Sequence, residues 1–246
     1  MRVFVVAMLT LAAAHSAAAQ NAVRALTPLE VAVACGPPPT LEMAADPLRV
    51  VGAQDTVRRV VFNTNDLLVV GGGTDKGVQL GQQFYIRRPI ITGSDRVHPK
   101  GLLTLGWASV VAVNEKTAIV KLDHFCGAIY SGDYLDPYTA PEVPAVVEHD
   151  DSTGELQFDA LSRIVGGNEN QSSGGLGSLM LIDRGAEQDT QAGMRFAVYR
   201  DVRTAGMPLA AVGEGVVLAV GKSMSVARIT KSRDAIIAGD YIVPRK

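Results

Sequence analysis

Two stretches of the chain carry one pattern: residues 106–137 read GWASVVAVNEKTAIVKLDHFCGAIYSGDYLDP, and residues 213–244 read GEGVVLAVGKSMSVARITKSRDAIIAGDYIVP. A constant offset of 107 aligns them without a gap, and ten of the 32 positions are identical. The identical positions are Gly106/Gly213, Val110/Val217, Ala112/Ala219, Val113/Val220, Ala128/Ala235, Ile129/Ile236, Gly132/Gly239, Asp133/Asp240, Tyr134/Tyr241 and Pro137/Pro244. Self-similarity at a fixed spacing indicates a duplicated structural unit.

The repeat extends upstream at an offset of 112, where four further residues recur. They are Gly73/Gly185, Gly81/Gly193, Phe84/Phe196 and Arg88/Arg200. The change of offset means that the first copy has five extra residues, and we expect them in a loop within Pro89–Leu105. The two repeats are predicted to cover residues 48–138 and 157–246, joined by a linker over 139–156.

Each repeat carries the signals of short β-strands and few helix signals. Residues 67–70 and 179–182 are continuous apolar runs, as expected of buried strands. Residues 107–113 and 118–122 predict a hairpin, which the second copy repeats around Gly221-Lys222. We therefore predict an all-β fold of two tandem small β-barrels, because closure removes the exposed edges of short strands.

The order of these signals resembles a known module. A Gly81-x-x-Phe84 or Gly193-x-x-Phe196 turn leads into a strand that ends in Arg, and Gly-Asp-Tyr follows near the end. This is similar to the C-terminal β-barrel domain of the flagellar assembly protein T family and to modules that follow LysM repeats in exported bacterial proteins. The resemblance implies an envelope module for assembly or binding. The chain departs from both settings, with no LysM-like repeat and only a short N-terminal arm.

The N-terminus predicts export. Arg2 precedes an apolar run over residues 3–14, and Ala17-Ala18-Ala19 forms a small-residue cleavage site, so residues 1–19 fit a cleaved signal peptide. The mature chain would begin near Gln20 and be periplasmic or secreted. No later apolar stretch is long enough for a transmembrane helix. Residues 20–47, with three consecutive prolines, are expected to form an extended arm.

The two cysteines, Cys35 and Cys126, predict one disulfide in an oxidising compartment. It would pin the arm to the first repeat and contribute about 4 kcal/mol on the chain-entropy model. Three alternatives remain open. Cys35 could carry a lipid anchor, because Val33-Ala34-Cys35 weakly resembles a lipobox. The two thiols could be buried and unpaired, or His124 and Cys126 could form part of a metal site.

The sequence contains no recognisable set of catalytic residues, and we expect neither a cofactor nor a metal. Lys and Arg total 23 against 25 Asp and Glu, which gives no sign of a nucleic-acid binder. Residues 71–77 lack the spacing of a phosphate-binding loop. No Gly-x-Ser-x-Gly motif is present. Asp133 and Asp240 recur in matching turns, so we expect them to be structural.

These observations predict a non-enzymatic scaffold, adaptor or binding module of the bacterial cell envelope, with assembly of an envelope or flagellar structure as one role. Its partner would be an envelope protein or a glycan, met at the groove between the repeats or at the inserted loop. The candidate contact residues are Arg87, Arg88, Arg96, His98 and Lys100. The alternatives are an envelope hydrolase or carbohydrate-active enzyme with a site between the barrels, and an outer-membrane lipoprotein anchored through Cys35.

Overall fold

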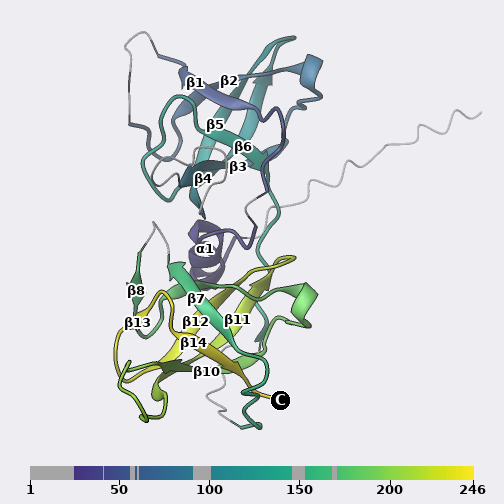
Figure 1. The fold of residues 1–246 in the computed structure, drawn as a ribbon. Coiled ribbons are helices and arrows are strands. Elements are labelled where there is room, and N and C mark those ends of the chain that lie inside the picture. The colour runs from purple at the N-terminus through teal and green to yellow at the C-terminus, as the bar shows by residue number, and fades with distance from the viewer. Residues whose placement is uncertain are drawn as a thin grey trace, which may run out of the picture.

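The protein forms two closed, six-stranded antiparallel β-barrels with a short helix between them (Figure 1). This architecture comes from a computed structural model that describes residues 25–40, 42–55, 59, 61–90, 101–145, 153–167 and 171–246. The predicted all-β fold of two tandem barrels is confirmed. No helix within these ranges is both long and apolar enough to cross a bilayer.

Barrel 1 is built from the first repeat. Its strands are β1 (Arg49–Ala53), β2 (Leu67–Gly71), β3 (Gln83–Ile90), β4 (Gly101–Val113), β5 (Thr117–Phe125) and β6 (Tyr134–Pro137). They pair in the order β1-β2-β5-β4-β3-β6, and β6 returns to β1. The interior is filled by fully buried aliphatic side chains such as Leu68, Ile86 and Val120.

Barrel 2 repeats this construction. Its strands are β7 (Ser162–Gly167), β9 (Leu179–Ile182), β10 (Arg195–Arg200), β11 (Ala210–Val220), β12 (Ser225–Ser232) and β14 (Tyr241–Pro244). A separate small sheet pairs β8 (Ser173–Gly174) with β13 (Ile236–Ile237). A short 3-10 turn follows the second strand of each barrel, at Thr74–Lys76 and at Ala186–Gln188.

The strand registers of the two barrels match at the offset read from the sequence. Gly106 pairs with Phe125 across β4 and β5, and Gly213 pairs with Ser232 across β11 and β12. Both hairpins also shift register at matching positions, between Val110 and Ala112 in barrel 1 and between Val217 and Ala219 in barrel 2. The internal repeat is therefore a repeat of structure as well as of sequence.

The recurring turn glycines have the backbone conformation expected of them. Gly81 has φ +78° and Gly193 has φ +88°, which places both in the left-handed region that favours glycine. Each lies just before the strand that contains the shared Phe84 or Phe196. Shared glycines thus reverse the chain at the same point of each barrel.

The recurring Gly-Asp-Tyr turn holds an ion pair in each barrel. Arg88 donates from Nε and Nη2 to the two Asp133 carboxylate oxygens, both at 2.7 Å. Arg200 does the same to Asp240 at 2.8 and 2.7 Å. The Asp133 and Asp240 side chains are almost fully buried and also accept a backbone N–H three residues upstream. The four recurring residues therefore form one structural lock, present twice.

The sequence predicted an extended N-terminal arm over residues 20–47, and this prediction is wrong for part of it. Residues Pro28–Cys35 form helix α1. The Thr27 side chain accepts from the Glu30 backbone N–H, while Glu30 accepts from the Thr27 N–H at 2.7 Å, which is a capping box. Pro28 occupies the first turn, where its missing N–H costs nothing.

The predicted inserted loop is shorter than Pro89–Leu105. Pro89 pairs with Leu102 and Ile90 with Gly101, so both ends of this stretch belong to strands β3 and β4. Leu102 is buried, which favours strand pairing over the turn that Gly101 suggests. Residues 91–100, which include Arg96, His98 and Lys100, lie outside the described residues.

Candidate functional site: the groove between the barrels

Helix α1 packs on both barrels at once (Figure 1). Val31 and Ala34 join an aromatic cluster on barrel 1 that contains Trp107. Leu29 and Val33 instead pack with Val216 and Leu218 of barrel 2. Because its apolar residues face two different partners, the helix ties the barrels together by burying side chains against each.

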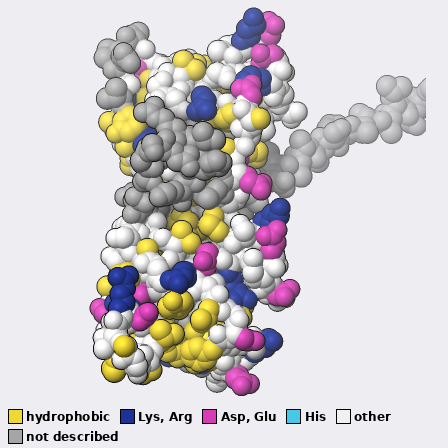
Figure 2. Space-filling model, in the orientation of Figure 1, with side chains coloured by type: hydrophobic (Ala, Val, Ile, Leu, Met, Phe, Trp, Pro, Cys, Tyr) yellow, Lys and Arg dark blue, Asp and Glu magenta, His cyan; other side chains and the backbone are white. Residues whose placement is uncertain are grey.

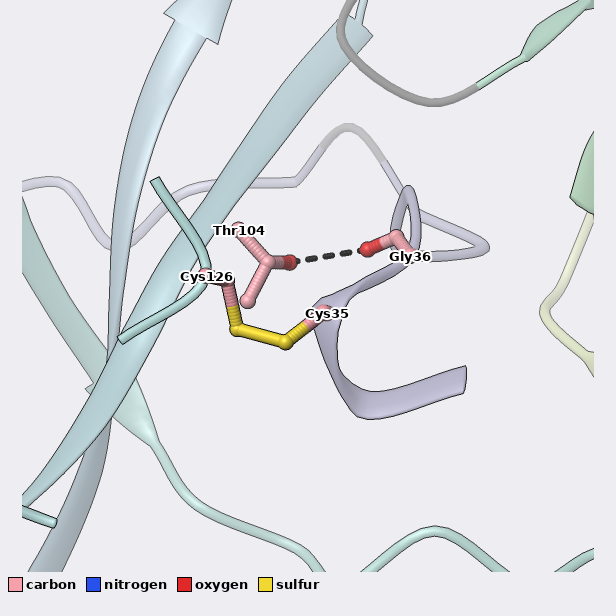
Figure 3. The surroundings of a disulfide bond; sticks show 4 residues. All are labelled: Cys35, Gly36, Thr104 and Cys126. Carbon is pink, nitrogen blue, oxygen red and sulfur yellow. Dashed lines mark hydrogen bonds between the residues drawn. A yellow bond between two sulfur atoms is a disulfide. The ribbon is translucent and has the colours of Figure 1, made fainter. Parts of the chain in front are cut away.

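A disulfide fixes the end of α1 to barrel 1, as predicted. Cys35 is bonded to Cys126, with Cα atoms 5.4 Å apart (Figure 3). Beside it, the buried Thr104 hydroxyl donates to the Gly36 carbonyl at 3.0 Å. The alternatives of unpaired thiols and of a lipid anchor on Cys35 are wrong, because a sulfur bonded to sulfur has no valence left for a proton or a thioether.

The metal-site alternative meets the same obstacle. Ligand atoms of Cys35, His124 and Cys126 all lie within 4.8 Å of one another. The two sulfurs are joined in the disulfide, so only the imidazole remains able to coordinate an ion. The His124 ring stacks on Trp107 at 4.4 Å between centroids, which gives this histidine a packing role.

Downstream of α1, the proline segment crosses toward barrel 2. A Cβ atom added at Gly221, in the β11–β12 turn, would overlap the Pro39 carbonyl. The first repeat has Asn114 at the matching position. Glycine at 221 therefore lets the arm lie directly against barrel 2.

The arm, the linker and both barrels enclose a groove with a cavity of about 340 Å³. The arm contributes Pro37–Pro39, the linker contributes Pro141, and barrel 2 contributes Ala219 and Val226. Tyr85, Arg87, Thr104 and Asp136 supply the polar wall on barrel 1. The groove is thus mostly apolar, with a few polar groups gathered on one side, as is common in binding sites.

Arg87 is the most distinctive side chain of this wall. It is 8% exposed, and its Nη1 donates to Asp136 Oδ2 at 2.6 Å. Its guanidinium lies over the Tyr85 ring, 4.7 Å from the centroid. Its Nε is buried and has no hydrogen-bond partner among the described residues. A buried donor left unpaired is costly, and this Nε is closed off from solvent, so Asp136 and the Tyr85 ring are what hold the Arg87 guanidinium in the wall.

Two tyrosines near Arg87 are held in their neutral form. Burial raises the pKa of Tyr85 to about 12, and the Tyr85 hydroxyl donates to the Thr139 carbonyl at 2.9 Å. Burial likewise raises the pKa of Tyr134 to about 12, with the Arg87 charge opposing the shift. Both hydroxyls are thus protonated at neutral pH, and the Tyr85 proton is used in the bond that fixes Thr139 at the edge of the groove.

The predicted contact residues do not gather on one open surface within the described part of the chain. Arg87 lines the groove but is nearly buried, and Arg88 is half-buried in its ion pair with Asp133. The other three lie within 91–100. The inserted loop as a contact surface stays a prediction, whereas sequence reasoning had no signal for Asp136 or Tyr85 as groove residues.

The hydrolase alternative requires two convergent acids, or a histidine beside an acid. The groove has one lining acid, Asp136, and a second cavity in barrel 2 has one, Asp189, among the described lining residues. Of the histidines, His124 is stacked on Trp107, and His149 lies outside the described residues. No specific observation therefore favours this alternative.

The visible surface mixes both signs of charge. Figure 2 shows Lys and Arg side chains interspersed with Asp and Glu over both barrels, and an apolar area on barrel 2. This distribution fits the near balance of 23 basic and 25 acidic residues. No family model and no curated protein matches the chain.

Proposed function

We propose that the protein is a non-enzymatic adaptor of the bacterial cell envelope that holds a segment of a partner protein or glycan in the groove between its barrels. The observation that carries this proposal is the groove itself, a cavity bounded by four separate parts of the chain. Its walls are mostly apolar, and Tyr85, Arg87, Thr104 and Asp136 are its polar lining residues on barrel 1. Such a surface recognises a ligand by burial and a few hydrogen bonds.

The closed barrels favour this mode over strand addition. Strand addition needs a sheet edge with unpaired backbone groups. Each barrel sheet closes on itself, so the six strands of each are paired on both sides over part of their length. A partner is therefore expected to bury side chains against the prolines of the groove.

Export is a separate part of the proposal. The pattern over residues 1–19 and the Cys35–Cys126 disulfide both support an oxidising compartment outside the cytoplasm. N-terminal sequencing of the protein recovered from cell fractions tests this point. We expect a mature N-terminus near Gln20 in the periplasmic or secreted fraction, and an intact N-terminus in the cytoplasm would contradict it.

Site-specific cross-linking tests the groove. Thr139 is exposed and lines the groove, whereas Glu115 is exposed in the β4–β5 turn. A photo-reactive phenylalanine analogue at each position would be illuminated in an envelope fraction. We expect a defined adduct from position 139 and none from position 115. Equal adducts from both positions, or none from either, would overturn the proposal.

A further inference from the structure

Barrel 2 contains a second cavity, which shares no lining residue with the groove. Its volume is about 550 Å³, within the range of small-molecule sites. It lies between the 3-10 turn Ala186–Gln188, the turn before β10 and the end of β14. Its lining includes Gln157, Arg184, Asp189, Gln191, Met194 and Lys246. We call it the barrel-2 cavity.

Arg184 is held rigidly in the wall of the barrel-2 cavity by neutral oxygen atoms. Its Nη1 donates to the Ala160 carbonyl at 2.7 Å, its Nη2 to the Gln188 carbonyl at 2.9 Å and its Nε to the Thr190 hydroxyl at 3.1 Å. These bonds use three of the five guanidinium N–H groups and leave two. Rigid placement of this kind prepares a guanidinium for a ligand without further ordering.

The charge of Arg184 is not neutralised by its contacts. In the described part of the chain no carboxylate lies within ion-pair distance of its guanidinium, in contrast to Arg88 and Arg200. Burial lowers the pKa of Arg184, against the opposing effect of Asp189 and Asp183. The neighbouring Arg245 donates to Glu214 at 3.2 Å and is therefore already paired. A partly buried cation of this kind favours an anion.

Barrel 1 shows that the fold does not require this arginine. The shared Gly73/Gly185 aligns Arg184 with Gly72 in barrel 1. A Cβ atom added at Gly72 would overlap the Leu48 side chain, so leucine fills that place. Leu48 lies beside Leu135 in barrel 1, and Ser162 takes the same place beside Ile242, the equivalent of Leu135, in barrel 2. Barrel 2 thus has a serine and an arginine where barrel 1 has a leucine and a glycine, and the exchange replaces an apolar filling by a cation.

We propose that the barrel-2 cavity binds a small organic acid, whose carboxylate meets the two remaining N–H groups of Arg184. Planar guanidinium and planar carboxylate match in a two-point contact. The Gln157 and Gln191 amides offer further hydrogen bonds, and Met194 offers an apolar surface for the carbon skeleton. This inference does not depend on the groove or on the adaptor role.

Amide NMR titration of the full-length protein at constant ionic strength tests the site. The probes are malonate, inorganic phosphate and neutral glucose. We expect saturable shifts with malonate in residues 184–194, weaker binding of phosphate and no saturation with glucose. Phosphate binding as tight as malonate, or shifts that do not saturate, would overturn the assignment.

Variants separate a site from general charge attraction. Arg184→Gln is expected to weaken malonate binding at least tenfold, whereas Lys116→Gln, which removes one exposed positive charge from barrel 1, leaves it unchanged. Because Arg184→Gln also removes three structural hydrogen bonds, Ala192→Trp provides a second test. It narrows the cavity from an exposed lining position and leaves those bonds in place. Equal binding by Ala192→Trp and the unmodified protein would contradict the proposal.

Discussion

Barrels 1 and 2 share one framework and differ in what surrounds it. Both close six strands in the same circular order, match in hairpin register and lock a Gly-Asp-Tyr turn with an arginine. Only barrel 1 is bonded to the arm through a disulfide and carries the Tyr85–Trp107–Tyr138 cluster. Among the described residues, only barrel 2 places an arginine without a carboxylate partner in a cavity wall.

The residues of the two copies fall into a shared group and an unshared group. Residues present in both copies are explained by chain reversal, core packing and the Arg–Asp lock. Residues present in one copy, such as Arg87 with its Asp136 partner and Arg184, line the two cavities. In the second repeat, Val243 stands where Asp136 does, and Gly72 stands where Arg184 does in the first. The unshared residues are therefore where function is expected.

Loss of the disulfide is expected to have the largest effect and to separate the barrels most clearly. A Cys35→Ser, Cys126→Ser variant should lower the free energy of unfolding of barrel 1 by about 4 kcal/mol, because the bond closes a span of 91 residues. Trp107 is the single tryptophan, so its fluorescence follows barrel 1, while circular dichroism follows both barrels. Equal shifts of both transitions would show that α1 couples the barrels into one unit. Dithiothreitol should not change the unfolding free energy of this double variant, which has no disulfide to reduce.

The Arg–Asp lock provides the next comparison. Asp133→Asn and Asp240→Asn should each cost about 2–3 kcal/mol of unfolding free energy, because each removes the buried carboxylate that accepts two hydrogen bonds from its arginine, and Asp240→Asn leaves Arg200 with the exposed Asp234 as its carboxylate partner. Asp234→Asn is the matched control, since Asp234 pairs with the same Arg200 but its side chain is 65% exposed. We expect that control to cost under about 0.5 kcal/mol. Chemical denaturation of the three variants measures all of these values. A large loss in only one barrel would contradict an equivalent role.

Alkaline pH should produce the smallest difference, confined to barrel 1. Burial raises the pKa of Tyr85 and Tyr134 to about 12, so the folded state favours the neutral phenols. Their contribution is complete below pH 10 and is lost as pH rises toward 12. The counterpart of Tyr85 in barrel 2 is Ala197. Stability measured by Trp107 fluorescence from pH 9 to 12 should fall, and a Tyr85→Phe, Tyr134→Phe variant should reduce that slope. An unchanged slope would refute the assignment.

The sequence predicted the barrels because duplication made local signals visible twice. A single Gly81 is weak evidence, but Gly81 and Gly193 before matching Phe strands indicate one turn repeated. The same logic identified Arg88/Arg200 and Asp133/Asp240 as shared residues. It did not pair them, because the partners are 45 and 40 residues apart in the chain and meet only when β3 or β10 lies beside the last strand of its barrel.

Helix α1 and the groove were harder to predict for a physical reason. The capping box Thr27-Pro28-Leu29-Glu30 was present as a signal. The helix has only eight residues, however, and buries opposite sides against different barrels, so it shows no single apolar stripe. The sequence predicted contact between the repeats and named Arg87, but the walls of the groove come from four distant segments whose meeting no local pattern indicates. Gly101 suggested a loop where buried Leu102 extends β4.

The position of α1 between the barrels also sets an order of events during synthesis. Cys35 leaves the ribosome 91 residues before Cys126, and the barrel-2 residues that cover Leu29 and Val33 are made later still. The arm therefore cannot complete its contacts until Cys126 has been made and an oxidant takes up the two electrons and two protons released as the disulfide forms, and until barrel 2 supplies the second docking surface. The arm and both barrels reach their final arrangement only after the β11–β12 hairpin has been translated. A product truncated before this hairpin would leave Leu29 and Val33 of α1 uncovered, and quality-control proteases can recognise such exposed apolar residues.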